Sequence, residues 1–327
     1  MKRREFIGLI GGAAVWPAAV CAQQKERVRR IGILVPFPQN DAAGQARVRA
    51  FRRELLRLGW SEGGNVQFDE RWSTENMDAV RADAARLVEL KPDVILTSGD
   101  RVIPVFMKLT SSIPIVVGAT SDPIASGAAE SLARPGHNVT GFSLIEFSMF
   151  GKMLEILKLI APSITRVGMI YNPDNPVGAT YQRWFGSSAV ELGVRPINLP
   201  IRDVTSIERA IAGMAEQPNG GILSPPDLTT IIHWAQVVNL TKRHCVPAIY
   251  TSRFFGEAGG LVTYGADDVE MFRQAAGYVD RILHGEKPGD LPFQPTTFLL
   301  RINLKTAKAL GLDVPATLLA RADEVVE

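Results

Sequence analysis

The sequence predicts an α/β protein built from two doubly wound lobes, because one arrangement of strands and loops occurs in it twice. Residues 30–36 and 166–172 are nearly alike: each is an apolar run with β-branched residues that ends in a loop bearing Pro and Asn. Two further pairs recur in the same order, namely 93–100 with 221–227 and 113–118 with 246–251. Runs of this kind are typical of strands buried on both faces of a parallel sheet. We therefore expect two Rossmann-like sheets facing each other across a cleft, since open α/β sheets bind ligands beside the carboxyl ends of their strands.

The first lobe is expected to alternate strands and helices. After the strand at 30–36, residues 42–58 carry apolar side chains at helical spacing among five arginines, and Gly59 ends this helix. A strand at 65–72, a helix at 79–90 and, after Pro92, a strand at 94–96 follow. This order is that of a doubly wound sheet with right-handed crossovers.

The second lobe is expected to begin with a helix at 147–160 and to repeat the alternation. Its strands are expected near 166–171, 194–199, 221–223 and 247–250, with helices at 176–192, 205–216 and 228–243 between them. A further helix at 269–283, a turn at 284–289, a strand at 297–303 and two short helices complete the chain. From the residues alone, these last elements fit either lobe.

Composition and charge exclude several classes of protein. A chain of 327 residues, 46% hydrophobic and with a mean hydropathy of +0.06, is long enough for two globular domains with full cores. The excess of two positive charges lies entirely in residues 1–22, which contain three basic residues, Lys2, Arg3 and Arg4, and one acidic residue, Glu5. The rest of the chain is neutral, so no basic surface for a nucleic-acid backbone is expected.

Residues 1–22 are expected to be an export signal peptide. A basic start is followed by an apolar, Gly- and Ala-rich stretch at 6–20 and by a small-residue cleavage site that ends at Ala22. The RREFI sequence at 3–7 resembles the twin-arginine signal, with the general secretory route as the alternative. We expect a periplasmic protein, cleaved after Ala22 and not inserted in the membrane afterwards. Acylation of Cys21 is the less favoured alternative, because Val20 precedes it where a small residue is preferred.

The sequence contains no convincing catalytic or metal-binding motif. The four histidines, His137, His233, His244 and His284, are scattered, and no cluster has the spacing of a metal site. Neither a G-x-S-x-G motif nor a phosphate-binding glycine loop after a strand is present. The one cysteine of the exported chain, Cys245, is expected to be a buried thiol. We therefore expect binding rather than catalysis, with no cofactor and no metal.

Polar and aromatic residues follow the predicted strands at the edge where a ligand would bind. Hydroxyl, amide and carboxylate groups there can hold a polar ligand, although the same residue types also favour turns. The candidate ligand-binding residues are Phe37, Gln39, Ser98, Gly99, Thr120, Ser121, Asp122, Asn175, Asp227, Thr251 and Arg253.

Several longer motifs resemble those of a known family along the whole exported part of the chain. They are RIGIL (30–34), LGWSEG (58–63) with Asn65 and Val66, SLARPGHNVTG (131–141), NPDNP (172–176), EAGGL (257–261) with Tyr264 and Gly265, INLKTAKALG (302–311) and RADE (321–324). The chain thereby resembles the ABC-transporter substrate-binding family whose characterised members take up aromatic amino acids. These motifs are specific for the family and say little about the ligand.

The resemblance implies the type I periplasmic-binding-protein architecture, with two lobes joined by three crossovers. The crossovers are expected near 139–143, 264–268 and 284–296. Lobe 1 would then comprise 30–141 and 267–284, and lobe 2 would comprise 142–263 and 297–327.

The resemblance also implies a function and roles for the candidate residues. The expected protein is a monomer that captures a small solute, such as an aromatic amino acid, and delivers it to an ABC permease and its ATPase subunit. Hydroxyls and backbone N–H groups of Ser98, Gly99, Thr120 and Ser121 would bind the ligand carboxylate, Asp122 or Asp227 its ammonium, and Phe37 would stack on its side chain. The alternatives are a periplasmic sensor or regulatory subunit with the same cleft and, less favoured, an enzyme on paired Rossmann-like lobes. A signal peptide occupies the place where a repressor would carry its DNA-binding domain.

Overall fold

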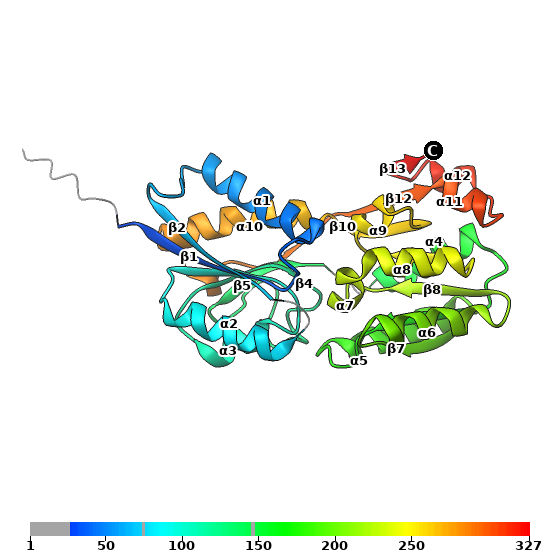
Figure 1. The fold of residues 1–327 in the computed structure, drawn as a ribbon, viewed down its shortest axis with the longest axis horizontal. Coiled ribbons are helices and arrows are strands. Elements are labelled where there is room, and N and C mark those ends of the chain that lie inside the picture. The colour runs from blue at the N-terminus through cyan, green and yellow to red at the C-terminus, as the bar shows by residue number, and fades with distance from the viewer. Residues whose placement is uncertain (1–26, 74–75, 145–147) are drawn as a thin grey trace, which may run out of the picture.

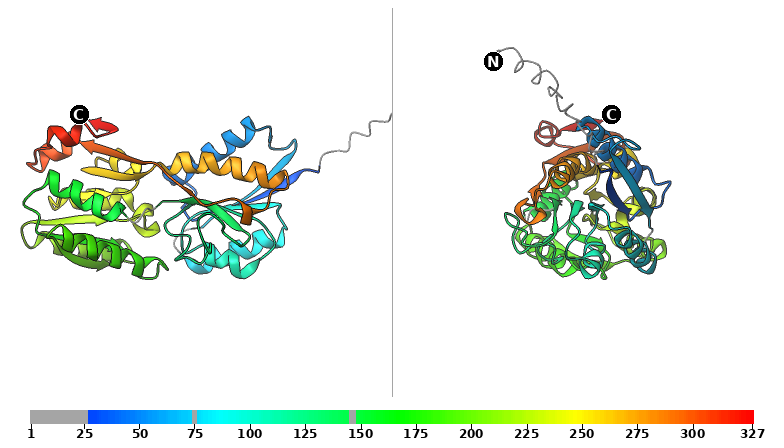
Figure 2. Two further views of the ribbon diagram at one scale, coloured as in Figure 1. Left: turned by 180° about the vertical axis from the view of Figure 1, so that it is seen from behind. Right: turned by 90° about the vertical axis from the view of Figure 1, so that its left-hand side faces the viewer.

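The structure, a computed structural model, describes residues 27–73, 76–144 and 148–327. It consists of two α/β halves that lie side by side along the long axis of the molecule, each with one sheet between layers of helices (Figures 1 and 2). The expected signal peptide lies outside the described residues. Within them, no helix is both long enough and apolar enough to cross a membrane.

Sheet A, in the N-terminal half, has six parallel strands in the order β11-β5-β4-β3-β1-β2. Their bounds are β1 Arg29–Val35, β2 Val66–Trp72, β3 Val94–Thr97, β4 Ile115–Thr120, β5 Val139–Ser143 and β11 Gln294–Pro295. Helices α1 (Ala42–Arg57) and α10 (Asp268–Leu283) cover one face, and α2 (Met77–Glu89) and α3 (Ile103–Leu109) cover the other (Figure 1). The central strands β3 and β4 are buried along their whole length, as expected for a sheet covered on both faces.

Sheet B, in the other half, has seven strands in the order β13-β12-β10-β9-β8-β6-β7, and only β10 and β12 pair antiparallel. The strands are β6 Arg166–Tyr171, β7 Arg195–Pro200, β8 Gly220–Ser224, β9 Ala248–Tyr250, β10 Val262–Ala266, β12 Phe298–Asn303 and β13 Glu324–Val326. The helices are α4 Met149–Ile160, α5 Gly178–Glu191, α6 Val204–Ala215, α7 Leu228–Ile232, α8 Trp234–Arg243, α9 Arg253–Glu257, α11 Leu304–Ala309 and α12 Ala316–Leu319. A short 3₁₀ turn, η1 (Pro288–Asp290), precedes β11.

The chain passes between the sheets three times. It leaves sheet A after β5, returns after β10 through α10, which packs against α1, and crosses again between β11 and β12. Residues 139–143 are thus a strand of sheet A, and the crossing follows them. The lobe boundaries expected from the sequence stay predictions.

Two sequence-based expectations about local structure are wrong. The helix expected at 228–243 is two helices, α7 and α8, because His233 has φ −100° and ψ 25° and interrupts the helical backbone. Cys245 is exposed rather than buried. It lies two residues after the end of α8, directly after the capping residue His244, and its φ of 51° places it in a tight turn.

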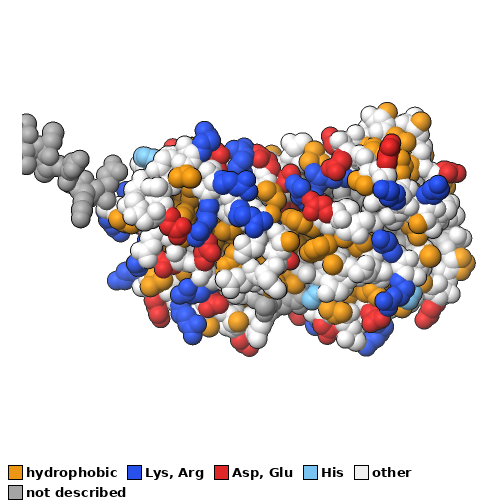
Figure 3. Space-filling model, turned by 45° about the horizontal axis from the view of Figure 1, so that its top comes forward, with side chains coloured by type: hydrophobic (Ala, Val, Ile, Leu, Met, Phe, Trp, Pro, Cys, Tyr) orange, Lys and Arg blue, Asp and Glu red, His pale blue; other side chains and the backbone are white. Residues whose placement is uncertain are grey.

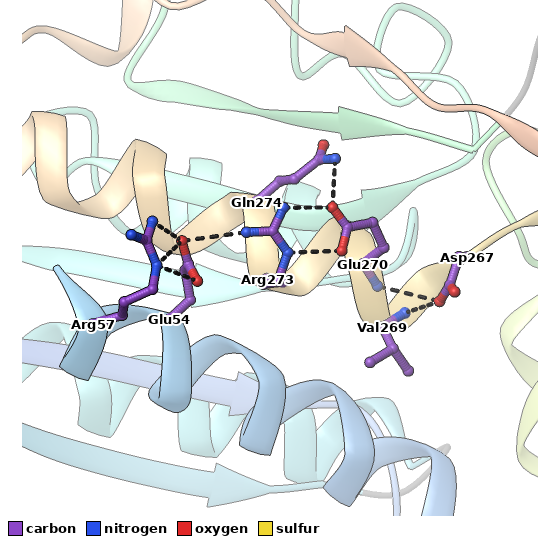
Figure 4. A network of polar contacts seen from close by, with 7 residues as sticks. All are labelled: Glu54, Arg57, Asp267, Val269, Glu270, Arg273 and Gln274. Carbon is purple, nitrogen blue, oxygen red and sulfur yellow. Dashed lines mark hydrogen bonds and ion pairs between the residues drawn. The ribbon is translucent and has the colours of Figure 1, made fainter.

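A network of ion pairs joins the outer surfaces of α1 and α10 (Figure 4). Arg273 binds Glu270 on its own helix, with an Nη2–Oε1 distance of 2.6 Å, and Glu54 on α1, with an Nη1–Oε1 distance of 3.2 Å. Glu54 also accepts from Arg57. The pKa of Glu54 is lowered, chiefly by its hydrogen bond from Arg57 and to a lesser extent by Arg273. Arg273 also lowers the pKa of Glu270.

Arg273→Gln should lower the free energy of unfolding at pH 7 by about 1 kcal/mol, since a half-exposed ion-pair network contributes little more than that. A carboxylate whose pKa is lowered on folding stabilises the protein above its unfolded pKa, and this stabilisation is lost as pH falls through the folded value. The difference between variant and wild type should therefore be full at pH 7 and disappear well below the ordinary glutamate pKa of about 4.3.

Urea unfolding followed by circular dichroism at pH 7 and at acid pH measures both effects. The control is Arg81→Gln, which removes an exposed pair with Asp78 within α2 and should cost less. A cost of Arg273→Gln that is equal at both pH values would contradict the assignment.

Candidate functional site

A cavity lies between the two halves, at the carboxyl ends of both sets of parallel strands. The space between its wall atoms is about 460 Å³ including open solvent, and the free volume that admits the centre of a water molecule is only about 40 Å³, so the walls lie close together. Its walls are Phe37, Arg47, Ser98, Gly99, Asp100, Arg101, Ala119, Thr120, Ser121, Leu144 and Asp268 from the N-terminal half and its crossings, and Asn175, Pro226, Leu228 and Ile231 from the other half.

The topology explains why these residues meet. The loops after β1, β3 and β4 in sheet A and after β6 and β8 in sheet B all start from the edges that face each other. Gly99 turns the loop after β3 with φ +91°, a conformation that favours glycine. Figure 3 shows hydrophobic side chains gathered where the halves meet, with acidic and basic side chains interspersed over the rest of that face.

One wall of the cavity is acidic, because it carries the buried carboxylate of Asp100. Its Oδ1 accepts from the Thr120 hydroxyl at 2.5 Å and from the Ser121 backbone N–H at 2.8 Å. Burial raises the pKa of Asp100, and these bonds counteract the rise. The hydroxyl of Ser121 donates across the cleft to the Pro226 carbonyl at 3.1 Å, so this wall also links the two halves.

Three of the four residues expected to bind a ligand carboxylate donate hydrogen bonds within the protein. Thr120 and Ser121 donate to Asp100 and Pro226, and the Gly99 N–H donates to the Ala119 carbonyl at 2.8 Å. These donors are already used within the protein and lie beside the Asp100 carboxyl group. The carboxylate-binding role expected for Ser98, Gly99, Thr120 and Ser121 stays a prediction.

Another part of the wall contains a buried ion pair of Arg47 and Asp268, whose side chains are 3% and 4% exposed. The Arg47 Nη2 donates to the Asp268 carboxylate, which also accepts from the Ser252 hydroxyl at 3.0 Å. The guanidinium lies over the Phe37 ring at 4.6 Å and the Phe254 ring at 5.6 Å. Its Nε and Nη1 atoms are buried and have no hydrogen-bond partner among the residues that the structure describes.

The two carboxylates expected to bind an ammonium do not line the cavity. Asp227 begins α7 and accepts from the backbone N–H groups of Thr229 and Asn172 and from the Asn175 amide, at 3.0–3.1 Å. Burial raises its pKa, and these bonds oppose the rise. Asp122 accepts from the N–H groups of Ile124 and Ala125. Both carboxylates shape loops, which is the turn chemistry that the same residue types favour.

Of the other expected residues, Phe37, Ser98 and Asn175 line the cavity, whereas Gln39, Thr251 and Arg253 do not. Gln39 is exposed. Thr251 is buried, with an unpartnered Oγ1. Arg253 is 2.8 Å from Glu257 and 3.7 Å from Asp267.

Sequence reasoning missed both members of the buried ion pair, Arg47 and Asp268. A signal for Arg47 was present: Ala43, Phe51 and Leu55 are among the buried positions of α1, and position 47 fits their four-residue spacing. An arginine on that face must either be paired or bind something. Asp100 and the apolar wall residues Leu144, Leu228 and Ile231 were also missed.

One family model matches nearly the whole described chain, which therefore belongs to that family. A family model described as "ABC transporter substrate binding protein" matches residues 31–326. A curated tyrosine-binding protein of Clostridioides difficile (strain R20291) is 24% identical over 293 residues, which cover 88% of this chain and 82% of the relative.

Solved structures show the same fold. An ABC domain in complex with L-Trp from Streptococcus pneumonia has a TM-score of 0.83 at 22% identity and covers 90% of this chain and 100% of its own. A conserved domain protein of Vibrio cholerae has a TM-score of 0.85 at 25% identity, with 91% and 100% covered. The ligand-free, open structure of a Clostridium difficile substrate-binding protein has a TM-score of 0.67 at 23% identity, with 91% and 99% covered. The predicted fold class, two doubly wound lobes of type I periplasmic-binding-protein architecture, is confirmed.

Proposed function

Because this chain belongs to the ABC transporter substrate-binding protein family, we propose that it captures a small solute between its two halves and delivers it to a membrane permease and its ATPase. The cavity carries this proposal. Loops from the carboxyl ends of both sheets line it, so a bound solute would contact both halves at once and favour their closed arrangement. The proposed protein binds its ligand without chemical turnover and is exported to the periplasm as a monomer, with residues 1–22 removed.

We propose an aromatic amino acid as the solute. The cavity combines apolar walls, including Phe37, Leu144 and Leu228, with an acidic group and a basic group, a combination that suits a zwitterion with an apolar side chain. The relatives named for tyrosine and for an L-Trp complex support this class of ligand.

A thermal-shift screen of amino acids tests the proposal. At 100 times its dissociation constant, a ligand that binds only the folded state adds about 2.7 kcal/mol to stability, so the melting temperature should rise clearly with at least one aromatic amino acid. Leu228→Glu should abolish the shift, because it places a carboxylate in the apolar wall. Val190→Glu, at a position on α5 that is 73% exposed, is the control and should keep the shift.

Two results would contradict the proposal. An absence of any shift with tyrosine, tryptophan and phenylalanine would exclude this ligand class. A full shift in the Leu228→Glu protein would place the ligand outside the cavity.

A further inference from the structure

We propose that Arg47 binds the carboxylate of the transported solute, so that a carboxylic acid group is the feature the cavity requires. This inference rests on the proposed function and adds to it the orientation and the chemical class of the ligand. The carboxylate would point toward Arg47 on α1 rather than toward Asp100.

The hydrogen bonding of Arg47 is the first support. Its side chain is buried, Asp268 binds Nη2, and two aromatic rings lie against the guanidinium. The remaining nitrogens, Nε and Nη1, have no partner. Buried polar groups in folded proteins are nearly always hydrogen-bonded, and an unmade bond to a charged group is costly. A carboxylate is the natural partner, because it accepts from a planar guanidinium in the same plane.

The charges on the two walls are the second support. The Thr120 and Ser121 donors near Asp100 are used within the protein, so the Asp100 side of the cavity offers a carboxyl group that can accept from a ligand ammonium. Asp268 is held by Ser252, so it keeps Arg47 in place and leaves the other guanidinium nitrogens available. An amino acid would therefore lie with its ammonium toward Asp100 and its carboxylate toward Arg47.

Arg52 provides a matched comparison on the same helix. It also lies over a phenylalanine, Phe68 at 4.5 Å, pairs with Glu62 and Glu70, and has an unpartnered Nε. Arg52 does not line the cavity. The Arg52 side chain is 35% exposed and that of Arg47 is 3% exposed, so their effects on stability would differ. A change in the preference for acids over amides, in contrast, should occur only at Arg47 if this residue recognises the ligand.

Titration calorimetry with acids and their matching amides tests the inference. The pairs are L-phenylalanine with L-phenylalaninamide, 3-phenylpropionate with 3-phenylpropanamide, and 4-methylpentanoate with 4-methylpentanamide, and phenethylamine is added as a cation without a carboxylate. In the wild type, each acid that binds should bind about 10- to 150-fold more tightly than its amide, since a charged hydrogen bond is worth about 1.5–3 kcal/mol. Arg47→Gln should reduce the acid-to-amide ratio to near one, and Arg52→Gln should leave it unchanged.

The outcomes separate this inference from the proposed function. Equal binding of phenylalanine and its amide to the wild type overturns the role of Arg47 and leaves an aromatic solute in place. If 4-methylpentanoate binds but its amide and the aromatic compounds do not, the result supports the role of Arg47 and overturns the proposal of an aromatic ligand. Binding of phenethylamine without any acid overturns the role of Arg47 and keeps the cavity as a solute site. If the Arg47→Gln protein does not fold, the acid-to-amide ratios of the wild type still test the role of Arg47. The Arg47→Lys protein should bind more weakly but should still prefer acids to amides.

Discussion

Asp268→Leu is expected to lower the free energy of unfolding of the ligand-free protein by about 3–5 kcal/mol, the usual cost of removing one partner of a buried ion pair. The Asp268 side chain is 4% exposed and accepts from Arg47 and Ser252. Without it, the Arg47 guanidinium would stay in the core with no opposite charge. Asp268 also lies in the first turn of α10, where a negative charge favours the helix dipole.

Urea unfolding followed by circular dichroism measures this cost. Asp78→Ala is the control, because Asp78 also lies in the first turn of a helix but is 88% exposed, and its loss should cost less than about 1 kcal/mol. The double variant Arg47→Leu/Asp268→Leu should recover most of the lost stability, since it removes both charges. A double variant no more stable than Asp268→Leu would show that the cost does not come from the uncompensated Arg47.

Gly265→Ala is expected to destabilise the protein by at least about 3 kcal/mol, at the upper end of the cost of overpacking. A Cβ at position 265 would lie 1.7 Å from the backbone oxygen of Thr251, so the strands β9 and β10 would have to separate. Gly265 lies at the end of β10, just before the chain crosses to α10 and Asp268. The substitution should therefore also weaken ligand binding.

The melting temperature measures the effect, and a glycine elsewhere in the chain provides the control. Gly186 lies in α5, and a Cβ there would meet nothing within 4 Å. Gly186→Ala should stabilise the protein by about 0.5–1 kcal/mol, the difference in helix propensity. If the Gly265→Ala protein had the same melting temperature as the wild type, β9 and β10 would accommodate a side chain easily.

Long, strongly patterned elements could be predicted from the sequence to within a few residues, and short ones could not. Helix α1 begins at the expected Ala42 and β6 coincides with 166–171. The seven-residue α3 and five-residue α9 were missed, because short helices have little propensity of their own and form through packing. The same holds for β10 and β11, whose place in a sheet depends on distant strands.

Some residues of the candidate site could be predicted from the sequence, and others could not. Loop residues such as Ser98, Thr120 and Asn175 line the cavity because the carboxyl ends of parallel strands meet at one edge, which strand order alone implies. Asp122 and Asp227 have the same chemistry in the same kind of loop, yet they bind backbone N–H groups. No local pattern distinguishes a carboxylate that caps a turn from one that faces a ligand.

The sequence by itself determined the two repeated sheets, the facing loops and the family, because periodicity, turn residues and motifs are local properties of the chain. Only the tertiary structure decided which charges face the cavity. Arg47 and Asp268 are 221 residues apart and meet because α1 and α10 pack on the same face of sheet A. Because that pair and Asp100 are buried, their polar groups matter for stability and for ligand binding. Burial depends on the whole folded chain and not on any local stretch of sequence.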